Sequence, residues 1–170
     1  MNKQVSEMLE GMVSDLKTYL QTHNIDDPVL LGIHTGGAWV AQALHERLSD
    51  DIPLGQLDIS FYRDDFSRIG MHPQVRPSNI PFSIENRHVL LVDDVLYTGR
   101  TIRAAMNEIF DYGRPASITL VVLVERDGRE LPIEAQVVGA HLQLAADEQV
   151  KLRGPDPLHL DIVSLEPEDD

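Results

Sequence analysis

Val-Leu-Leu-Val-Asp-Asp-Val-Leu-Tyr-Thr-Gly-Arg-Thr, residues 89–101, is the stretch from which the fold of this chain can be predicted. Residues 89–92 are aliphatic and β-branched, which predicts a buried strand that ends before the two aspartates. Residues 102–110 then place apolar side chains at helical spacing, and Gly113 and Pro115 end that pattern. A buried strand that leads directly into a helix is typical of α/β proteins with a parallel sheet.

The rest of the chain repeats this alternation of strand and helix. Residues 64–83 lack a clear period and carry several glycines and prolines, which predicts a flexible loop or a hairpin. We expect a single domain over residues 1–170, built on a doubly wound parallel sheet with right-handed crossovers. The other expected elements are helices over 5–20 and 40–48, strands at 29–33, 57–61, 118–124 and 137–138, and an alternating segment at 158–162.

Two carboxylates and a small-residue loop follow the central strand. Ligands of parallel sheets bind beyond the carboxyl ends of the strands, which is where Asp93 and Asp94 are expected. Their oxygens can accept hydrogen bonds from vicinal hydroxyls or face a hydrated Mg²⁺. The loop with Thr98, Gly99 and Thr101 exposes backbone N–H groups at a helix amino terminus, which favours phosphate. Each feature alone is common in structural turns; together they indicate a site for a phosphorylated sugar.

Two other classes of protein that handle phosphate are disfavoured by the motifs. A Walker-type nucleotide loop is excluded, because no Gly-x-x-x-x-Gly-Lys-Ser/Thr occurs. A phospho-acceptor receiver domain needs an acid cluster after its first strand, where this chain has His34-Thr35-Gly36-Gly37. That turn, the 64–83 loop and residues 93–101 are instead expected to converge on one cleft.

The balance of charge argues against RNA as a partner. The 170 residues include 14 basic and 28 acidic side chains, for a net charge of −14. Affinity for RNA comes chiefly from cations that meet phosphates, so such a chain repels RNA unless its few cations gather on one face.

Composition also bears on the compartment. Cysteine is absent, the seven histidines are scattered without zinc-ligand spacing, and no apolar run could span a membrane. The amino terminus has no apolar signal region. We therefore expect a cytoplasmic protein with no membrane partner.

The central motif resembles the phosphoribosyl-pyrophosphate (PRPP) motif of type I phosphoribosyltransferases, and the longer match resembles the PyrR family. PyrR proteins regulate pyrimidine operons and also have uracil phosphoribosyltransferase activity. The resemblance spans about residues 28–140 and implies the type I fold with a small C-terminal hood. It rests on residues 89–101 together with Gly32-Ile33, Thr35, Gly37, Tyr62-Arg63-Asp64-Asp65, Gly113-Arg114-Pro115 and Arg129-Glu130-Leu131-Pro132.

The resemblance also implies the roles of the site residues. Asp93 and Asp94 would bind the ribose hydroxyls and face the Mg²⁺ of PRPP, either directly or through water. Arg63, Arg68 and Arg76 are the loop cations able to neutralise diphosphate, and Arg76 is the one assigned to catalysis with the acid pair. The ribose and 5′-phosphate would contact Asp93, Asp94, Leu96, Tyr97, Thr98, Gly99, Arg100 and Thr101, and the pyrophosphate would contact Thr35, Gly36 and Gly37.

Three departures from the family pattern affect specificity. Purine enzymes of the superfamily usually carry Asp at the position of Tyr97, so Tyr97 favours a pyrimidine or a relaxed base pocket. Most PyrR proteins have Arg at the position of Gly36, and its loss predicts weaker binding or turnover of PRPP. Residues 142–144 read Leu-Gln-Leu where the hood usually has Ile-Pro-Thr, which leaves base specificity open.

The RNA-binding surface of PyrR proteins is also altered. Gly128, Arg129, Glu134 and Ala140 occupy the positions that are basic in RNA-binding relatives, and only Arg129 is basic here.

The sequence and the resemblance together leave three hypotheses about function. The first is a uracil phosphoribosyltransferase that transfers the pentosyl group of PRPP to uracil with Mg²⁺, as a homodimer or homotetramer. The second is a non-catalytic sensor of UMP, UTP or PRPP, and the third is an RNA attenuator, which the charge disfavours.

Overall fold

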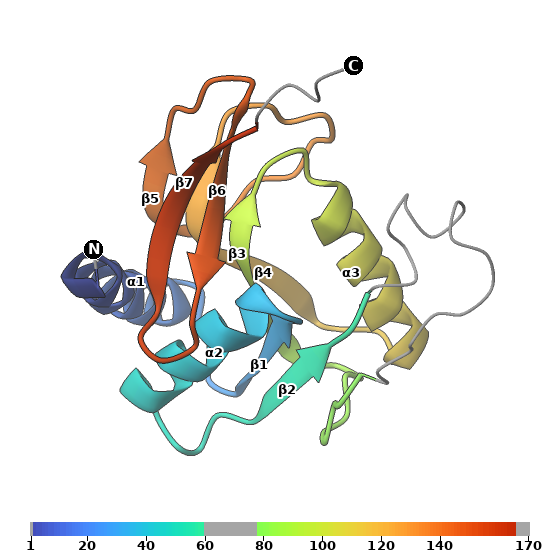
Figure 1. Ribbon diagram of the computed structural model, residues 1–170. Coiled ribbons are helices and arrows are strands. Elements are labelled where there is room, and N and C mark those ends of the chain that lie inside the picture. Colours follow the sequence, from blue (N-terminus) through green and yellow to red (C-terminus); the bar gives the residue numbers. More distant parts are fainter. Residues whose placement is uncertain (1, 60–77, 166–170) are drawn as a thin grey trace.

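The computed structural model describes residues 2–59 and 78–165, and Figure 1 shows how its helices and strands are arranged. None of the helices in these ranges is long and apolar enough to cross a membrane. The helices are α1 (Asn2–Thr22), α2 (Gly36–Arg47) and α3 (Arg100–Tyr112). The strands are β1 (Pro28–Ile33), β2 (Leu54–Leu57), β3 (His88–Leu96), β4 (Ser117–Arg126), β5 (Val137–Leu142), β6 (Glu148–Arg153) and β7 (His159–Ser164).

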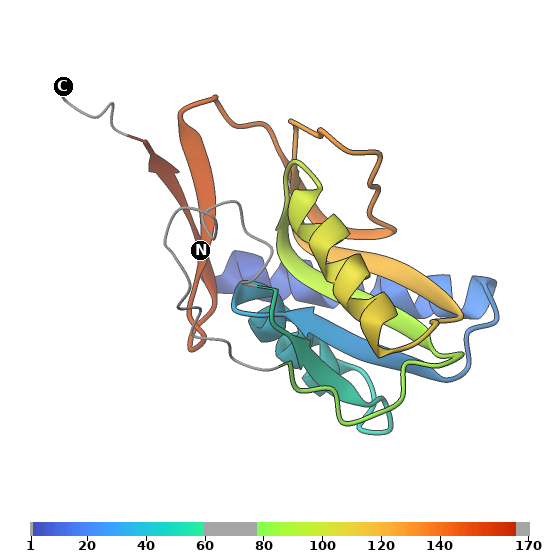
Figure 2. The ribbon, with the colours of Figure 1, turned by 90° about the vertical axis from the view of Figure 1, so that its right-hand side faces the viewer.

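One parallel sheet with the order β2-β1-β3-β4-β5 forms the centre of the molecule. Successive side chains of a strand point to opposite faces, so the apolar central strands divide their residues between two cores. Leu30 and Leu90 join α1 and α2 in one core, whereas Leu31 and Leu91 join α3 in the other. Figures 1 and 2 show helices on both sides of the sheet. The predicted doubly wound α/β fold is confirmed.

The central strand is longer than the sequence predicts. β3 continues to Leu96, so Asp93 and Asp94 lie within the strand, and the prediction that it ends at residue 92 is wrong. The cause is that the two strands beside β3 pair with it over different lengths. β1 pairs with β3 only as far as Val92, while β4 pairs with it through Leu96 and keeps it extended. At the acid pair, β3 is therefore paired with β4 on one side and is no longer paired with β1 on the other.

The second strand lies earlier than predicted. β2 ends at Leu57, whereas the alternation predicts a strand over residues 57–61. The ladder stops there because its partner β1 ends at Ile33, which is opposite Leu57. Ile59 is still buried, as the alternation predicts.

The predicted loop at 64–83 is described only from residue 78 onward. Arg63, Arg68 and Arg76, the loop cations expected to meet diphosphate, lie outside the described residues. Where the chain is described again, Asn79 exchanges both backbone hydrogen bonds with Gln56, at 2.8 and 2.9 Å. This end of the segment is thus attached to the edge strand β2.

A separate antiparallel hairpin, β6–β7, completes the described part of the chain. The alternation expected at 158–162 is confirmed as β7, but the sequence analysis missed β6. Val150, Leu152 and Leu160 pack into the core on the side of α1 and α2. Because strand side chains alternate, Lys151 and Arg153 take the exposed face of β6. The residues expected to form the hood, 142–144, are the last residue of β5 and the two residues after it, just before this hairpin.

Candidate active site

A hollow of about 400 Å³ lies at the carboxyl end of the sheet, where β1 and β3 are neighbours. β1 leads into a helix on one face and β3 into a helix on the other, and doubly wound folds bind ligands at this switch point. The cleft is lined by residues 33–36, 93–95 and 150–153, with Trp39 and Thr101. Three segments far apart in sequence thus meet in one place.

The acid pair caps the backbone of its own strand. The N–H of Asp94 donates to Oδ1 of Asp93 at 2.8 Å, and the N–H of Val95 donates to Oδ1 of Asp94 at 2.8 Å. Asp93 is buried, with 5% of its surface exposed, whereas Asp94 is half-buried. These bonds satisfy N–H groups at the level where β1 no longer pairs. They also orient the carboxylates, and Oδ2 of Asp94 lies against Gly36, which lines the cleft.

The glycines after β1 allow α2 to start directly against the acid pair. α2 begins at Gly36, with Thr35 as its N-cap, so the turn predicted at 34–37 is shorter than expected. A Cβ on Gly37 would lie 2.6 Å from the carbonyl oxygen of Val92, and a Cβ on Gly36 would lie 2.2 Å from Oδ2 of Asp94. Only residues without side chains permit this approach. The expected pyrophosphate turn and the acid pair are therefore in contact.

The expected phosphate loop connects β3 to α3. Gly99 is the N-cap of α3, with a φ of +94° that side chains disfavour. Oγ1 of Thr98 accepts a hydrogen bond from the N–H of Arg100 at 3.2 Å. The first turn of α3 presents its remaining N–H groups and the positive end of the helix dipole at Thr101, which lines the cleft. This is the geometry that binds anionic oxygens.

The segment after β4 holds this loop in place. The N–H groups of Glu130 and Leu131 donate to the carbonyl oxygen of Thr98 at 2.9 and 3.1 Å. Arg129 donates to the carbonyl oxygens of Tyr97 and Ile133 and pairs with Glu125. The Arg-Glu-Leu-Pro motif is thus a brace for the loop. The one basic residue at the RNA-binding positions is engaged inside its own molecule.

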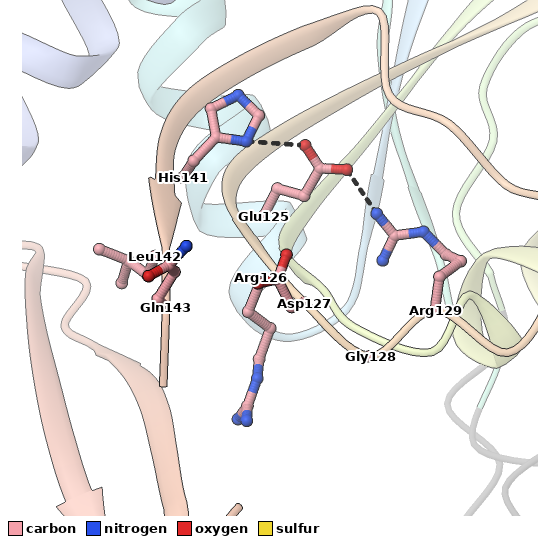
Figure 3. Close-up of a pocket in the computed structure, with 8 residues that line it drawn as sticks. All are labelled: Glu125, Arg126, Asp127, Gly128, Arg129, His141, Leu142 and Gln143. Carbon is pink, nitrogen blue, oxygen red and sulfur yellow. Dashed lines mark hydrogen bonds and ion pairs between the residues drawn. The ribbon is translucent and has the colours of Figure 1, made fainter. Parts of the chain in front are cut away.

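A second hollow, of about 280 Å³, lies at the carboxyl ends of β4 and β5 (Figure 3). In it Glu125 contacts both Arg129 and the ring of His141, whose Nδ1 is 3.0 Å away. The guanidinium of Arg126 lies 4.1 Å from the centre of the Tyr97 ring and donates to the carbonyl oxygen of Glu148 at 2.8 Å. The Tyr97 ring therefore lies beside Arg126 and Gly128, two residues that line this second hollow.

The structure brings together part of the predicted site. Thr35, Gly36, Asp93, Asp94 and Thr101 line the cleft. The side chain of Leu96 is buried in the core, and that of Arg100 turns outward to Glu130, with 3.4 Å between Nε and Oε1. Gly37, Tyr97, Thr98 and Gly99 are not among the residues that line the cleft, and Arg76 is outside the described residues.

Sequence reasoning missed the contribution of β6. Lys151 and Arg153 line the cleft beside the residues predicted to bind the sugar. The signal was present as a strict alternation of polar and apolar residues over 149–153, which predicts a half-buried strand. What no local pattern could reveal is that this strand folds back to the cleft.

The donor set fits a magnesium ion that the substrate holds in large part. In residues 2–59 and 78–165 no group of three or more His, Asp or Glu side chains is placed to hold a metal. Mg²⁺ is commonly bound by one or two carboxylates together with substrate phosphates and waters. The carboxylates of Asp93 and Asp94 match that pattern. Two carboxylates are too few for a metal site built from protein ligands alone.

Comparison with known proteins agrees with this geometry. Residues 5–152 match the phosphoribosyl transferase domain family. The chain is 58% identical over 165 residues to the bifunctional protein PyrR of Nitrosococcus oceani, covering 96% of this chain and 93% of that protein. It is 61% identical over 160 residues to the PyrR protein of Pseudomonas fluorescens, covering 94% and 95%.

Solved structures show the same architecture. The hypoxanthine phosphoribosyl transferase of Trypanosoma cruzi superposes with a TM-score of 0.71 at 25% identity, over 99% of this chain and 90% of that one. A hypoxanthine-guanine phosphoribosyltransferase of Bacillus anthracis shares the fold at 16% identity, with a TM-score of 0.67 over 88% of this chain and 84% of that one. Sequence, cleft and fold agree, and the chain is a member of the PyrR family within the type I phosphoribosyltransferase superfamily.

Proposed function

We propose that the protein transfers the phosphoribosyl group of PRPP to uracil and releases UMP and diphosphate. The N1 nitrogen of uracil forms a bond to the anomeric carbon as the bond from that carbon to diphosphate breaks. Diphosphate leaves with the bonding electrons, and the N1 proton passes to solvent. The observation that carries the proposal is the contact of three elements in one cleft: the acid pair, the glycine turn at the start of α2 and the amino end of α3.

Each element has a task in such a transfer. The transition state is a sugar cation that separates from a polyanion, so the protein must orient and stabilise rather than supply a nucleophile. Asp93 and Asp94 accept hydrogen bonds from the ribose hydroxyls, held in position by their own backbone bonds. The loop through Thr98 and Gly99 and the start of α3 bind the 5′-phosphate. Mg²⁺ held by PRPP would neutralise charge on the leaving diphosphate.

We assign the base to the second hollow, at the carboxyl ends of β4 and β5. Position 97 holds a tyrosine whose ring is packed against Arg126, so no carboxylate is offered there to a purine. Uracil presents carbonyl acceptors and N–H donors on its edge. Glu125 offers an acceptor, and His141 and Gln143 offer donors, at the ends of the neighbouring strands.

Base selectivity tests the proposed function. The purified protein with PRPP and Mg²⁺ is given uracil, hypoxanthine or guanine at equal concentrations, and nucleotide formation is followed. We expect UMP at a rate at least about ten-fold above that of either purine nucleotide, because a mismatch of polar groups on the edge of the base costs about 1.4 kcal/mol or more. Equal or faster purine transfer would contradict the assignment to uracil.

RNA is not expected to bind tightly. The net charge is −14, and Arg129, the basic residue at the family's RNA-binding positions, is already bonded to Glu125 and to two backbone carbonyls. Few phosphates could be neutralised, and little counterion release would follow. We expect no specific shift of a pyrimidine-operon leader RNA at physiological salt in a gel titration. Glu134→Arg with Ala140→Lys should strengthen binding, and tight binding by the unchanged protein would make regulation through RNA the primary function.

Other properties remain predictions. The single domain over residues 1–170 and the cytoplasmic location are predicted from the sequence, and the homodimer or homotetramer is implied by the family resemblance. A sensor that binds UMP or UTP without turnover would use the same cleft, and the assay of UMP formation separates it from the enzyme.

A further inference from the structure

The hairpin brings two cations to the cleft that no motif assigns. All four residues 150–153 of β6 line the hollow that contains the acid pair, and Lys151 and Arg153 lie on the face of the strand opposite the buried Val150 and Leu152. They are the lysine and arginine side chains in the described lining of the cleft. The other charged groups there, Asp93 and Asp94, are negative.

The pyrophosphate turn has no room for a cation of its own. A Cβ on Gly36 would lie 2.2 Å from Oδ2 and 2.7 Å from Cγ of Asp94, so any side chain at this position requires the carboxylate to move. An arginine at position 36, the residue that most PyrR proteins carry there, would displace a group expected to hold the ribose. A polyanion next to two carboxylates still needs positive charge, because unscreened like charges repel at these distances.

We infer that Lys151 and Arg153 bind the diphosphate of PRPP in place of the arginine that the turn lacks. The inference rests on the proposed function, since it assigns a further binding element to the same substrate. The side chain of Lys151 makes no hydrogen bond or ion pair within the described residues, and Lys151 lines the cleft. Arg153 can present its guanidinium to two phosphate oxygens at once.

Asp161 competes for these cations. It lies directly opposite Lys151 in the register of the hairpin, and its Oδ2 lies 3.3 Å from Nε of Arg153. His159 also faces it, with Nε2 at 3.9 Å from the same oxygen. The side chains of Arg153 and Asp161 are 50% and 37% exposed, so their ion pair is weak and can be exchanged for a phosphate. Removal of Asp161 should therefore strengthen the binding of diphosphate.

The inference predicts opposite effects of two variants on PRPP. Calorimetry with Mg²⁺-PRPP should give an affinity about 5- to 30-fold lower for Lys151→Met/Arg153→Gln and a few-fold higher for Asp161→Asn. UMP lacks the diphosphate, so its affinity should change less than two-fold in both. The control pair is Lys17→Met/Arg114→Gln, on α1 and before β4, which removes the same charge away from the cleft and should leave PRPP affinity unchanged.

The outcomes separate this inference from the proposed function. PRPP affinity that is equal in wild type and in folded Lys151→Met/Arg153→Gln overturns the role of the cations and leaves the transferase intact. A parallel loss for UMP and PRPP means that the hairpin acts only by shaping the cleft, which also overturns it. No binding of PRPP by the wild-type chain contradicts both proposals. If the double variant is unfolded by thermal melting, Asp161→Asn decides: tighter PRPP supports the inference, and unchanged or weaker PRPP refutes it.

Discussion

Replacing Asp93 and Asp94 together by asparagine should lower the affinity for Mg²⁺-PRPP by at least about 100-fold, because two charged hydrogen-bond acceptors are lost and each contributes about 1.5–3 kcal/mol. The affinity should be measured by calorimetry with PRPP and with UMP. UMP should also weaken, since both ligands carry the ribose hydroxyls. Unchanged affinity for both ligands in a folded double variant would show that the acid pair is not the ribose site.

The choice of asparagine protects the fold. Asp93 is buried and its Oδ1 accepts the N–H of Asp94, so removal of the whole side chain would leave that backbone group without a partner. An amide oxygen can keep this bond while the charge disappears. The matched control is Asp50→Asn/Asp51→Asn, an exposed acid pair outside the cleft lining, which should bind PRPP like the wild type.

Gly99→Val should remove most of the preference of the protein for UMP over uridine. Gly99 has a φ of +94°, and a Cβ there would lie 3.0 Å from Cγ1 and 3.2 Å from Cβ of Ile133. A valine would have to leave the left-handed conformation or push the side chain of Ile133 aside, and either change would cost about 1–3 kcal/mol. Either movement displaces the N–H groups at the start of α3 that would meet the 5′-phosphate.

Thermal melting in UMP and in uridine measures this effect. In the wild type, UMP should raise the melting temperature more than uridine at equal concentration, and in Gly99→Val the two shifts should become similar. Gly11→Val is the control, since Gly11 is an exposed residue of α1 with nothing within 4 Å of an added Cβ. It should leave helix stability equal or slightly higher, because valine has a higher helix propensity than glycine, and it should keep the difference between the ligands. Equal shifts by UMP and uridine in the wild type would contradict a phosphate site at this loop.

Much of the architecture follows from local patterns of apolar residues. Residues 89–92 are all apolar, and residues 118–124 are apolar except for Thr119; both segments form central strands that are buried on two faces. The helical stripe after Thr101 became α3, which ends before Gly113 as the sequence predicts. Such elements are predictable because burial and period are properties of the segment itself.

The errors lie where a neighbouring strand decides the outcome. β3 extends beyond residue 92 because β4 continues beside it, and β2 stops at Leu57 because β1 ends opposite. A ladder is a property of two strands, so neither boundary is visible in one. The role of the glycines at 36 and 37 likewise depends on a second segment of the chain. The sequence marks them as a turn, while the structure uses them to bring a helix against Asp94.

Only some of the residues of the site come from one stretch of sequence. Asp93, Asp94 and Thr101 belong to one motif and were found together. Lys151 and Arg153 are some fifty residues farther along the chain, and packing of the hairpin on α1 and α2 places them at the cleft. Long-range placement of this kind depends on the tertiary fold.

The central claim is that this cleft transfers a phosphoribosyl group to uracil, and formation of radiolabelled UMP tests it most directly. Labelled uracil, PRPP and Mg²⁺ are incubated with the wild-type protein and with the folded Asp93→Asn/Asp94→Asn variant, and the nucleotide is separated and counted. The account predicts PRPP-dependent UMP from the wild type and a rate at least about 100-fold lower from the variant. No UMP from folded wild-type protein, or equal rates from both proteins, would contradict it.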